Sequence, residues 1–163
     1  MTHMERHASM YRLQELFVPA AVARLPFDPR ISWNEYGVMT YFWPSPCARM
    51  QGLWVNVNEH EIMLSTGLSH THFDEHDWDV RNDESETLLD RIVNQGVIQA
   101  LNIINGDTVF TKSYDPQGNE DPSSGMSPRW LLNDLDRRSR WRQFRGDGWT
   151  ERAWDWQGEI TED

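Results

Sequence analysis

Apolar and polar residues alternate in the first half of the chain. The runs with a strand-like pattern are residues 38–43, 53–57 and 61–66. Leu53, Val55 and Val57 share one side of the second run, and Ile62 and Leu64 share one side of the third. A period of two is typical of strands that bury one face, because successive side chains point to opposite faces of a sheet. The pattern therefore predicts an antiparallel meander.

The N-terminal segment has helical spacing instead. Thr2 and Glu5 stand at the spacing of a capping box, and the apolar residues that follow are Met10, Leu13, Leu16 and Phe17. This spacing predicts an amphipathic helix. Because proline lacks the N–H that a helix interior uses, we expect the helix to end before Pro19, with one more short turn of helix over residues 20–25.

A second amphipathic pattern starts near Asp83. Asp83 suits a helix N-cap, Glu86 follows at capping-box spacing, and the apolar stripe is Leu88, Leu89, Ile92 and Val93. Gly96 is placed to end this helix. We expect a hairpin after it, with strands over residues 97–104 and 108–114 and Asn105-Gly106 as the two-residue turn.

The last third of the chain is richer in turn residues. Residues 115–127 contain Pro and Gly and predict a loop, and Ser127-Pro128 predicts the start of a short helix. Residues 140–156 flank Gly146-Asp147-Gly148 and predict another hairpin. The expected fold is α+β: an antiparallel sheet of hairpins and a meander, packed against one or two helices.

The length of the chain, 163 residues, predicts one α+β domain over residues 1–163. Within it we distinguish an N-terminal helical segment, residues 1–30, and a Trp/Arg-rich C-terminal segment, residues 137–163. Cys47 is the sole cysteine, and the N-terminus has no apolar stretch, so a cytoplasmic location is expected.

The charge is strongly negative. Asp and Glu number 26 against 15 Lys and Arg, a formal net charge of −11 at pH 7. Such a charge disfavours nucleic acid and anionic membranes as partners and attracts basic ones. The chain also has nine tryptophans, a residue type that is enriched in protein–protein interfaces as well as in cores.

Three histidines lie within a short stretch. His70 and His72 would point the same way on a strand, and His76 with Asp74 could add ligands for zinc from the following turn. The spacing departs from that of metallo-β-lactamase-like hydrolases, because Glu75 separates Asp74 from His76, and it also departs from the cupin pattern. The alternative is one strand continuing from Ile62, whose histidines would be half-buried and hydrogen-bonded without a metal.

Acidic residues crowd the same stretch. The candidate partner-binding residues are Asp74, Glu75, Asp77, Trp78 and Asp79. An anionic face with an aromatic anchor suits a basic protein partner. The alternative is an ordinary solvated surface.

Residues 137–152 are basic and aromatic, against the trend of the chain. Such a mixture can bind single-stranded nucleic acid. Alternatively, the arginine stems cover Trp faces and their guanidinium groups pair with Asp134, Asp136 and Glu151. The overall charge favours the second interpretation.

Residues 53–114 resemble small acidic bacterial immunity-type proteins of toxin–immunity systems. The features that carry the resemblance are the meander over Leu53–Leu68, the string His70-Thr71-His72-Phe73-Asp74, the acidic helix over 83–95 and the expected hairpin over 97–114. The resemblance implies a protein that binds and blocks a cognate toxin, with no catalysis and no cofactor. The alternatives are a metal-dependent enzyme using His70, His72 and His76, and an oligomeric scaffold or subunit.

Overall fold

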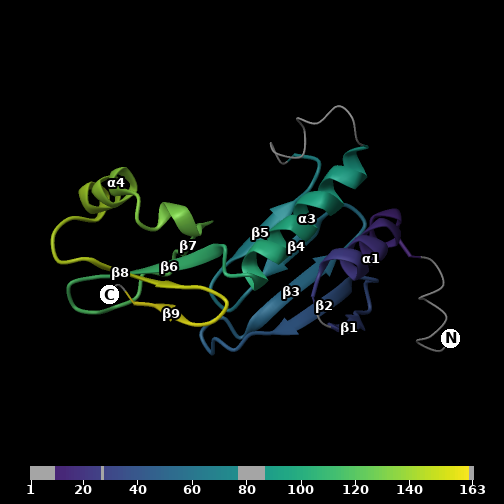
Figure 1. Cartoon of the computed structure of the whole chain (residues 1–163), viewed down its shortest axis with the longest axis horizontal. Helices are drawn as coiled ribbons and strands as arrows, with labels where there is room; N and C mark the ends of the chain where they lie inside the picture. Colours follow the sequence, from purple (N-terminus) through teal and green to yellow (C-terminus); the bar gives the residue numbers. More distant parts are fainter. Residues whose placement is uncertain (1–9, 27, 77–86, 162–163) are drawn as a thin grey trace. The chain divides into compact units, whose positions relative to one another are not determined.

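The computed structural model describes residues 10–26, 28–76 and 87–161. The chain divides into two compact units. The first unit consists of Met1–Pro44, Gly52–Thr66 and His70–Leu101. The second unit consists of Ser45–Gln51, Gly67–Ser69 and Asn102–Asp163. Each unit has its own antiparallel sheet (Figure 1). The predicted α+β class and the antiparallel hairpin architecture are confirmed. The assignment of the whole chain to one domain stays a prediction.

The first unit contains the predicted meander. In chain order its elements are α1 (Arg12–Arg24), β1 (Arg30–Trp33), β2 (Met39–Pro44), β3 (Gly52–Val57), β4 (Ile62–Ser65), β5 (His70–Phe73) and most of α3 (Leu88–Ile104). The five strands pair in sequence order. Tyr41 lies opposite Val55, and Val55 opposite Leu64, and all three are buried. The apolar positions of successive strands therefore share one face of the sheet.

Helices α1 and α3 cover that apolar face (Figure 1). The ring of Phe17 on α1 meets Tyr41 edge to face at 5.3 Å. Gln14, which is fully buried, donates from Nε2 to the carbonyl oxygen of Val57 at 2.9 Å. On α3, Gly96 lies against Ile62 of β4. Burial of this face supplies the main stabilisation of the unit.

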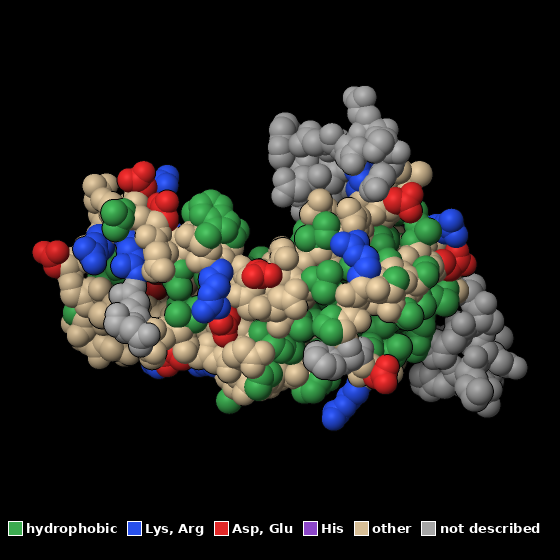
Figure 2. Space-filling view, viewed as in Figure 1, with side chains coloured by type: hydrophobic (Ala, Val, Ile, Leu, Met, Phe, Trp, Pro, Cys, Tyr) green, Lys and Arg blue, Asp and Glu red, His purple; other side chains and the backbone are tan. Residues whose placement is uncertain are grey.

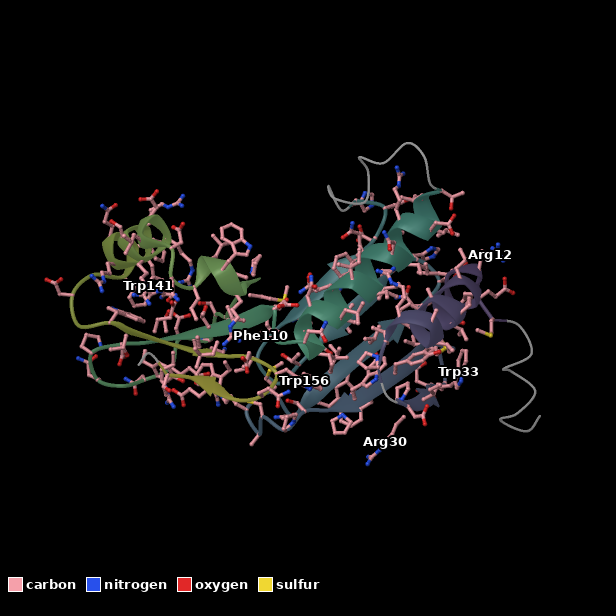
Figure 3. The ribbon with its side chains drawn as sticks, in the orientation of Figure 1. Arg12, Arg30, Trp33, Phe110, Trp141 and Trp156 are labelled. Carbon is pink, nitrogen blue, oxygen red and sulfur yellow. The ribbon has the colours of Figure 1, made fainter. Side chains whose placement is uncertain are left out.

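The opposite face of the sheet carries aromatic and polar side chains. The rings of Phe42 and Trp54 lie 4.9 Å apart, and Thr40 Oγ1 donates to Asn56 Oδ1 at 2.7 Å. Arg30 lies over the Phe42 ring at 5.9 Å and extends away from the helices (Figure 3). These residues are half-buried or exposed, as expected for an antiparallel sheet covered on one side.

The prediction that the first helix ends before Pro19 was wrong. Helix α1 runs to Arg24 with Pro19 inside it. An interior proline costs about 3 kcal/mol, because it removes a hydrogen bond and crowds the preceding turn. Burial of Leu13, Phe17 and Ala21, on both sides of the proline, offsets that cost. Thr2 and Glu5 lie outside the described residues.

The predicted strand over residues 97–104 was also wrong. These residues continue α3, and those buried at helical spacing are Val97, Ala100, Ile103 and Ile104. Gly96 is therefore an interior residue of the helix, and Gly106 ends it. Gly106 has φ +78° and donates its N–H to Ile103 O, while Asp107 N–H donates to Asn102 O at 2.8 Å. Asn105-Gly106 thus terminates a helix, where a left-handed residue satisfies the last carbonyls, and forms no hairpin turn.

The second unit contains β6 (Thr108–Tyr114), β7 (Gly125–Pro128), the 3-10 helix η2 (Arg129–Leu131), α4 (Leu135–Arg145), β8 (Thr150–Trp154) and β9 (Glu159–Ile160). The strand order is β7-β6-β8-β9. The predicted hairpin over 140–156 was wrong in its first half, which belongs to α4. Asp134 caps that helix by accepting from Arg137 N–H at 2.7 Å, and Gly146, at φ +86°, follows its end.

None of the helices built by the described residues has both the length and the apolar character needed to cross a membrane.

Candidate functional site

A pocket of about 580 Å³ lies in the first unit, among the ends of several of its elements. One side comes from the loop between β3 and β4. In this loop Asn58 N–H donates to Glu61 O at 3.1 Å, and Asn58 Oδ1 accepts from the backbone N–H groups of His60 and Glu61 at 2.7 and 2.8 Å. These bonds hold the loop in one conformation. They present Glu59, His60 and Glu61 along the pocket.

The second side comes from the end of β5. Ile62 pairs with Phe73, so the residues next to them, Glu61 and Asp74, emerge at the same end of the sheet. Asp74 Oδ1 accepts from His76 N–H at 2.6 Å, which turns the chain directly after the strand. Asp74, Glu75 and His76 all line the pocket. The strand register thus brings together acidic residues that are more than ten positions apart in the sequence.

The floor of the pocket is apolar and aromatic. Leu88, Leu89 and Ile92 contribute from the first turns of α3, and Tyr11 and Tyr36 complete the lining. Ile92 is buried at 1% exposure, whereas Tyr36 is 75% exposed. The pocket therefore combines an apolar base with a polar rim, an arrangement common to ligand and side-chain binding sites.

The rim of the pocket is negatively charged. It carries four carboxylates, Glu59, Glu61, Asp74 and Glu75, and none of the described residues that line the pocket is Lys or Arg. The side chains of Glu59 and Glu75 are 58% and 65% exposed, so they reach solvent and any approaching partner. Glu59 and Glu75 lie 3.6 and 3.4 Å from the ring nitrogens of His60 and His76, which become ion-pair partners when protonated.

The pocket includes part of the predicted partner-binding set. Asp74 and Glu75 line it. Asp77, Trp78 and Asp79 lie outside the described residues. Glu59 and Glu61 were not predicted as binding residues: Glu61 was expected to start the strand over residues 61–66, and Glu59 to lie in the connection before it. The pairing of β4 with β5, which the predicted three-strand meander did not include, places Glu61 beside Asp74.

The three predicted metal ligands, His70, His72 and His76, do not form one site among the described residues. His70 and His72 do share one face of β5, as expected, with ring centroids 5.3 Å apart, but His72 Nδ1 lies 2.9 Å from Glu61 Oε2 and His76 lines the acidic pocket. Across residues 10–26, 28–76 and 87–161, no group of three His, Cys, Asp or Glu side chains is placed to hold a metal ion.

The alternative of one strand continuing from Ile62 was wrong. Ser65 pairs with His70 and Ile62 with Phe73, so the chain reverses between β4 and β5. The reversal places Phe73 on the buried face and leaves His70 and His72 exposed. Gly67 lies in the reversal, where a β-carbon would stand 2.7 Å from Arg49 O, so only glycine fits there without a shift of the backbone.

No protein-family model, curated protein or solved structure matches this chain.

Proposed function

We propose that this chain is an immunity-type binding protein that neutralises a cognate, basic bacterial toxin by direct contact. The observation that carries the proposal is the acidic pocket, in which four carboxylates surround an apolar floor. The resemblance of residues 53–114 to immunity-type proteins supports the same function, although the hairpin expected over residues 97–114 is absent.

An arginine or lysine side chain of the partner suits this pocket. Its aliphatic stem would lie on Leu88, Leu89 and the tyrosine rings, while its charged head would reach the carboxylates at the rim. A small cation would gain little from the apolar floor, and an apolar side chain would bring no positive charge to the carboxylates. The pocket therefore discriminates in favour of long basic side chains.

The net charge of the chain supports a basic partner as well. At −11 the protein attracts a cationic surface over distances of about one Debye length, near 10 Å at 0.1 M salt. Such attraction raises the association rate, and immunity to a toxin benefits from fast capture. We expect the association rate to fall as the salt concentration rises.

The first experiment identifies the partner. The tagged chain is captured from its native source and the bound proteins are identified by mass spectrometry. We expect one stoichiometric, basic partner whose toxic activity the purified chain suppresses. Recovery of the chain alone would favour an oligomeric subunit over an immunity protein, and a partner without toxic activity would contradict the proposal.

The second experiment tests the pocket itself. Glu59→Lys with Glu75→Lys changes the charge of the rim by +4, through the loss of two negative charges and the gain of two positive ones. It leaves in place Asp74 and Glu61, whose carboxylates hold the local turns. The matched control is Asp28→Lys with Asp147→Lys, which changes the net charge equally at exposed acids outside the pocket. We expect the pocket variant to bind the toxin at least about ten-fold more weakly than the control. An equal loss of affinity in both variants would show that only the net charge matters, and it would refute a role for the pocket.

A further inference from the structure

The second unit holds a cavity of opposite character to the acidic pocket. It has a volume of about 490 Å³ and lies between α4 and the strands β8 and β9. Figure 2 shows basic and acidic side chains side by side around α4, at the left of the view. The residues that line this cavity include three arginines and two tryptophans: Arg138, Arg142, Arg152, Trp141 and Trp149.

The carboxylates of this cavity already have arginine partners. Glu151 accepts two hydrogen bonds from Arg137 at 2.9 and 3.0 Å, and Glu159 accepts two from Arg152 at 2.6 Å each. The hydrogen bonds from Arg152, and then its positive charge, lower the pKa of Glu159 below its ordinary value. Each carboxylate is paired with an arginine, and this pairing reduces its repulsion of an incoming anion.

Arg142 is the exception among the arginines of the cavity. Within the part of the chain that the structure describes, its guanidinium forms no hydrogen bond, ion pair or ring contact. It lies one helical turn after Arg138, whose Nε and Nη2 donate to the neutral oxygens of Leu132 and Asn133 at 3.3 and 3.2 Å. Arg142 thus offers a planar, doubly donating cation to the cavity, the geometry that binds phosphate and carboxylate best.

The two indoles are held in place by other contacts. Trp141 points from α4 toward the sheet (Figure 3), and its Nε1 donates to Ser113 Oγ at 3.2 Å. The guanidinium of Arg145 lies 4.9 Å from the ring centroid of Trp149 and is itself paired with Asp121 at 2.5 Å. Walls that are fixed before binding lose little conformational entropy when a ligand arrives.

We propose that this cavity binds a small anion that carries a planar ring, the chemistry of a nucleoside monophosphate. Arg142 binds the phosphate, and an indole wall stacks on the ring. The volume lies within the range of about 300–1,000 Å³ that small-molecule sites occupy. A nucleic acid polymer is disfavoured, because a chain of net charge −11 repels a polyanion far more than a single phosphate group.

Adenosine monophosphate is the first probe, titrated into the whole protein by calorimetry, with the indole N–H signals followed by nuclear magnetic resonance. We expect saturable binding of one molecule, with shifts of the Trp141 and Trp149 signals. Adenosine and inorganic phosphate should each bind more weakly, because each lacks one half of the recognised chemistry.

The decisive variant is Arg142→Gln, which should weaken binding at least about ten-fold by removing charge-assisted hydrogen bonds to phosphate. Its control is Arg140→Gln, which removes the same charge from the same helix at an exposed residue outside the cavity. Trp149→Leu should also weaken binding.

The proposal is overturned by a wild-type protein that does not bind the probe, or by equal losses in the two arginine variants. Tighter binding of an oligonucleotide than of the mononucleotide would replace it with single-stranded nucleic acid binding. These titrations contain no toxin, so their outcome does not depend on whether the protein neutralises one.

Discussion

Gly96 of α3 lies in direct contact with Ile62 of β4. A β-carbon on Gly96 would stand 3.0 Å from Ile62 Cγ2 and 3.1 Å from its Cδ1. Glycine in the middle of a helix is less favourable than alanine by about 1 kcal/mol. The close approach of helix and sheet, which buries Ile62 completely, explains why a glycine stands here.

Replacement of this glycine by a branched residue should destabilise the first unit. Gly96→Val is expected to lower the free energy of unfolding by about 1–3 kcal/mol, because the added carbons push the helix away from the sheet. Urea denaturation measures the change. The neighbouring variant Gln95→Val, at a half-buried position of the same helix, should change the stability by less than about 0.5 kcal/mol. Equal effects of the two variants would contradict the packing argument.

The buried Gln14 should be sensitive to loss of its amide. Its Nε2 donates to Gly37 O at 2.8 Å and to Val57 O at 2.9 Å, and its Oε1 accepts from Tyr11 N–H at 3.0 Å. Gln14→Leu leaves these backbone groups without partners and should cost about 2–4 kcal/mol. An exposed glutamine on α4 provides the comparison, since Gln143→Leu should be close to neutral. A nearly neutral Gln14→Leu would show that water replaces the amide.

Gly106 should resist substitution because of its backbone conformation. Its φ of +78° lies in the left-handed region, and its β-carbon would meet no atom closer than Asp155 Oδ2 at 3.5 Å. Gly106→Ala therefore tests the backbone alone, and we expect a loss of about 1–2 kcal/mol in the free energy of unfolding. In Gly158→Ala, where the φ is ordinary and the site is open, the stability should be unchanged or slightly higher. Equal stability of the two variants would argue against a left-handed Gly106.

The stability of the second unit should depend on pH through Asp121. Hydrogen bonds from Ser123 and Arg145 lower the pKa of Asp121 from 3.8 to about 2. Because the folded pKa is the lower one, this stabilisation is present above pH 3.8 and is lost as the pH falls towards 2. Urea unfolding at a series of pH values should show a steeper decline in this window for the wild type than for Asp121→Asn. Arg145→Gln, which removes one donor, should give an intermediate slope, and parallel profiles for all three proteins would refute this linkage.

Only part of the acidic pocket could be predicted from the local sequence. The acidic character of Asp74 and Glu75 was apparent from their sequence neighbourhood, and both line the pocket. Glu59 and Glu61 join them only through the pairing of β4 with β5, which is a contact between distant residues. The cavity of the second unit is likewise built from α4 and β8, which the sequence had suggested were two strands of one hairpin.

The sequence by itself determined the meander and the α+β class, because alternation along a strand is local and reports directly which face is buried. It also suggested that arginines of residues 137–152 cover tryptophan faces and pair with nearby acids including Glu151. The structure places the Arg145 guanidinium over the Trp149 ring and pairs Arg137 with Glu151. Residues 97–104 were ambiguous, since a short apolar run suits either a buried strand or a buried helix, and Asn105-Gly106 suits either a hairpin or a helix end. Tertiary packing decided between them. Gly96 lets the helix pass close to Ile62, and burial of Val97, Ala100 and Ile103 then favours the helix over the strand.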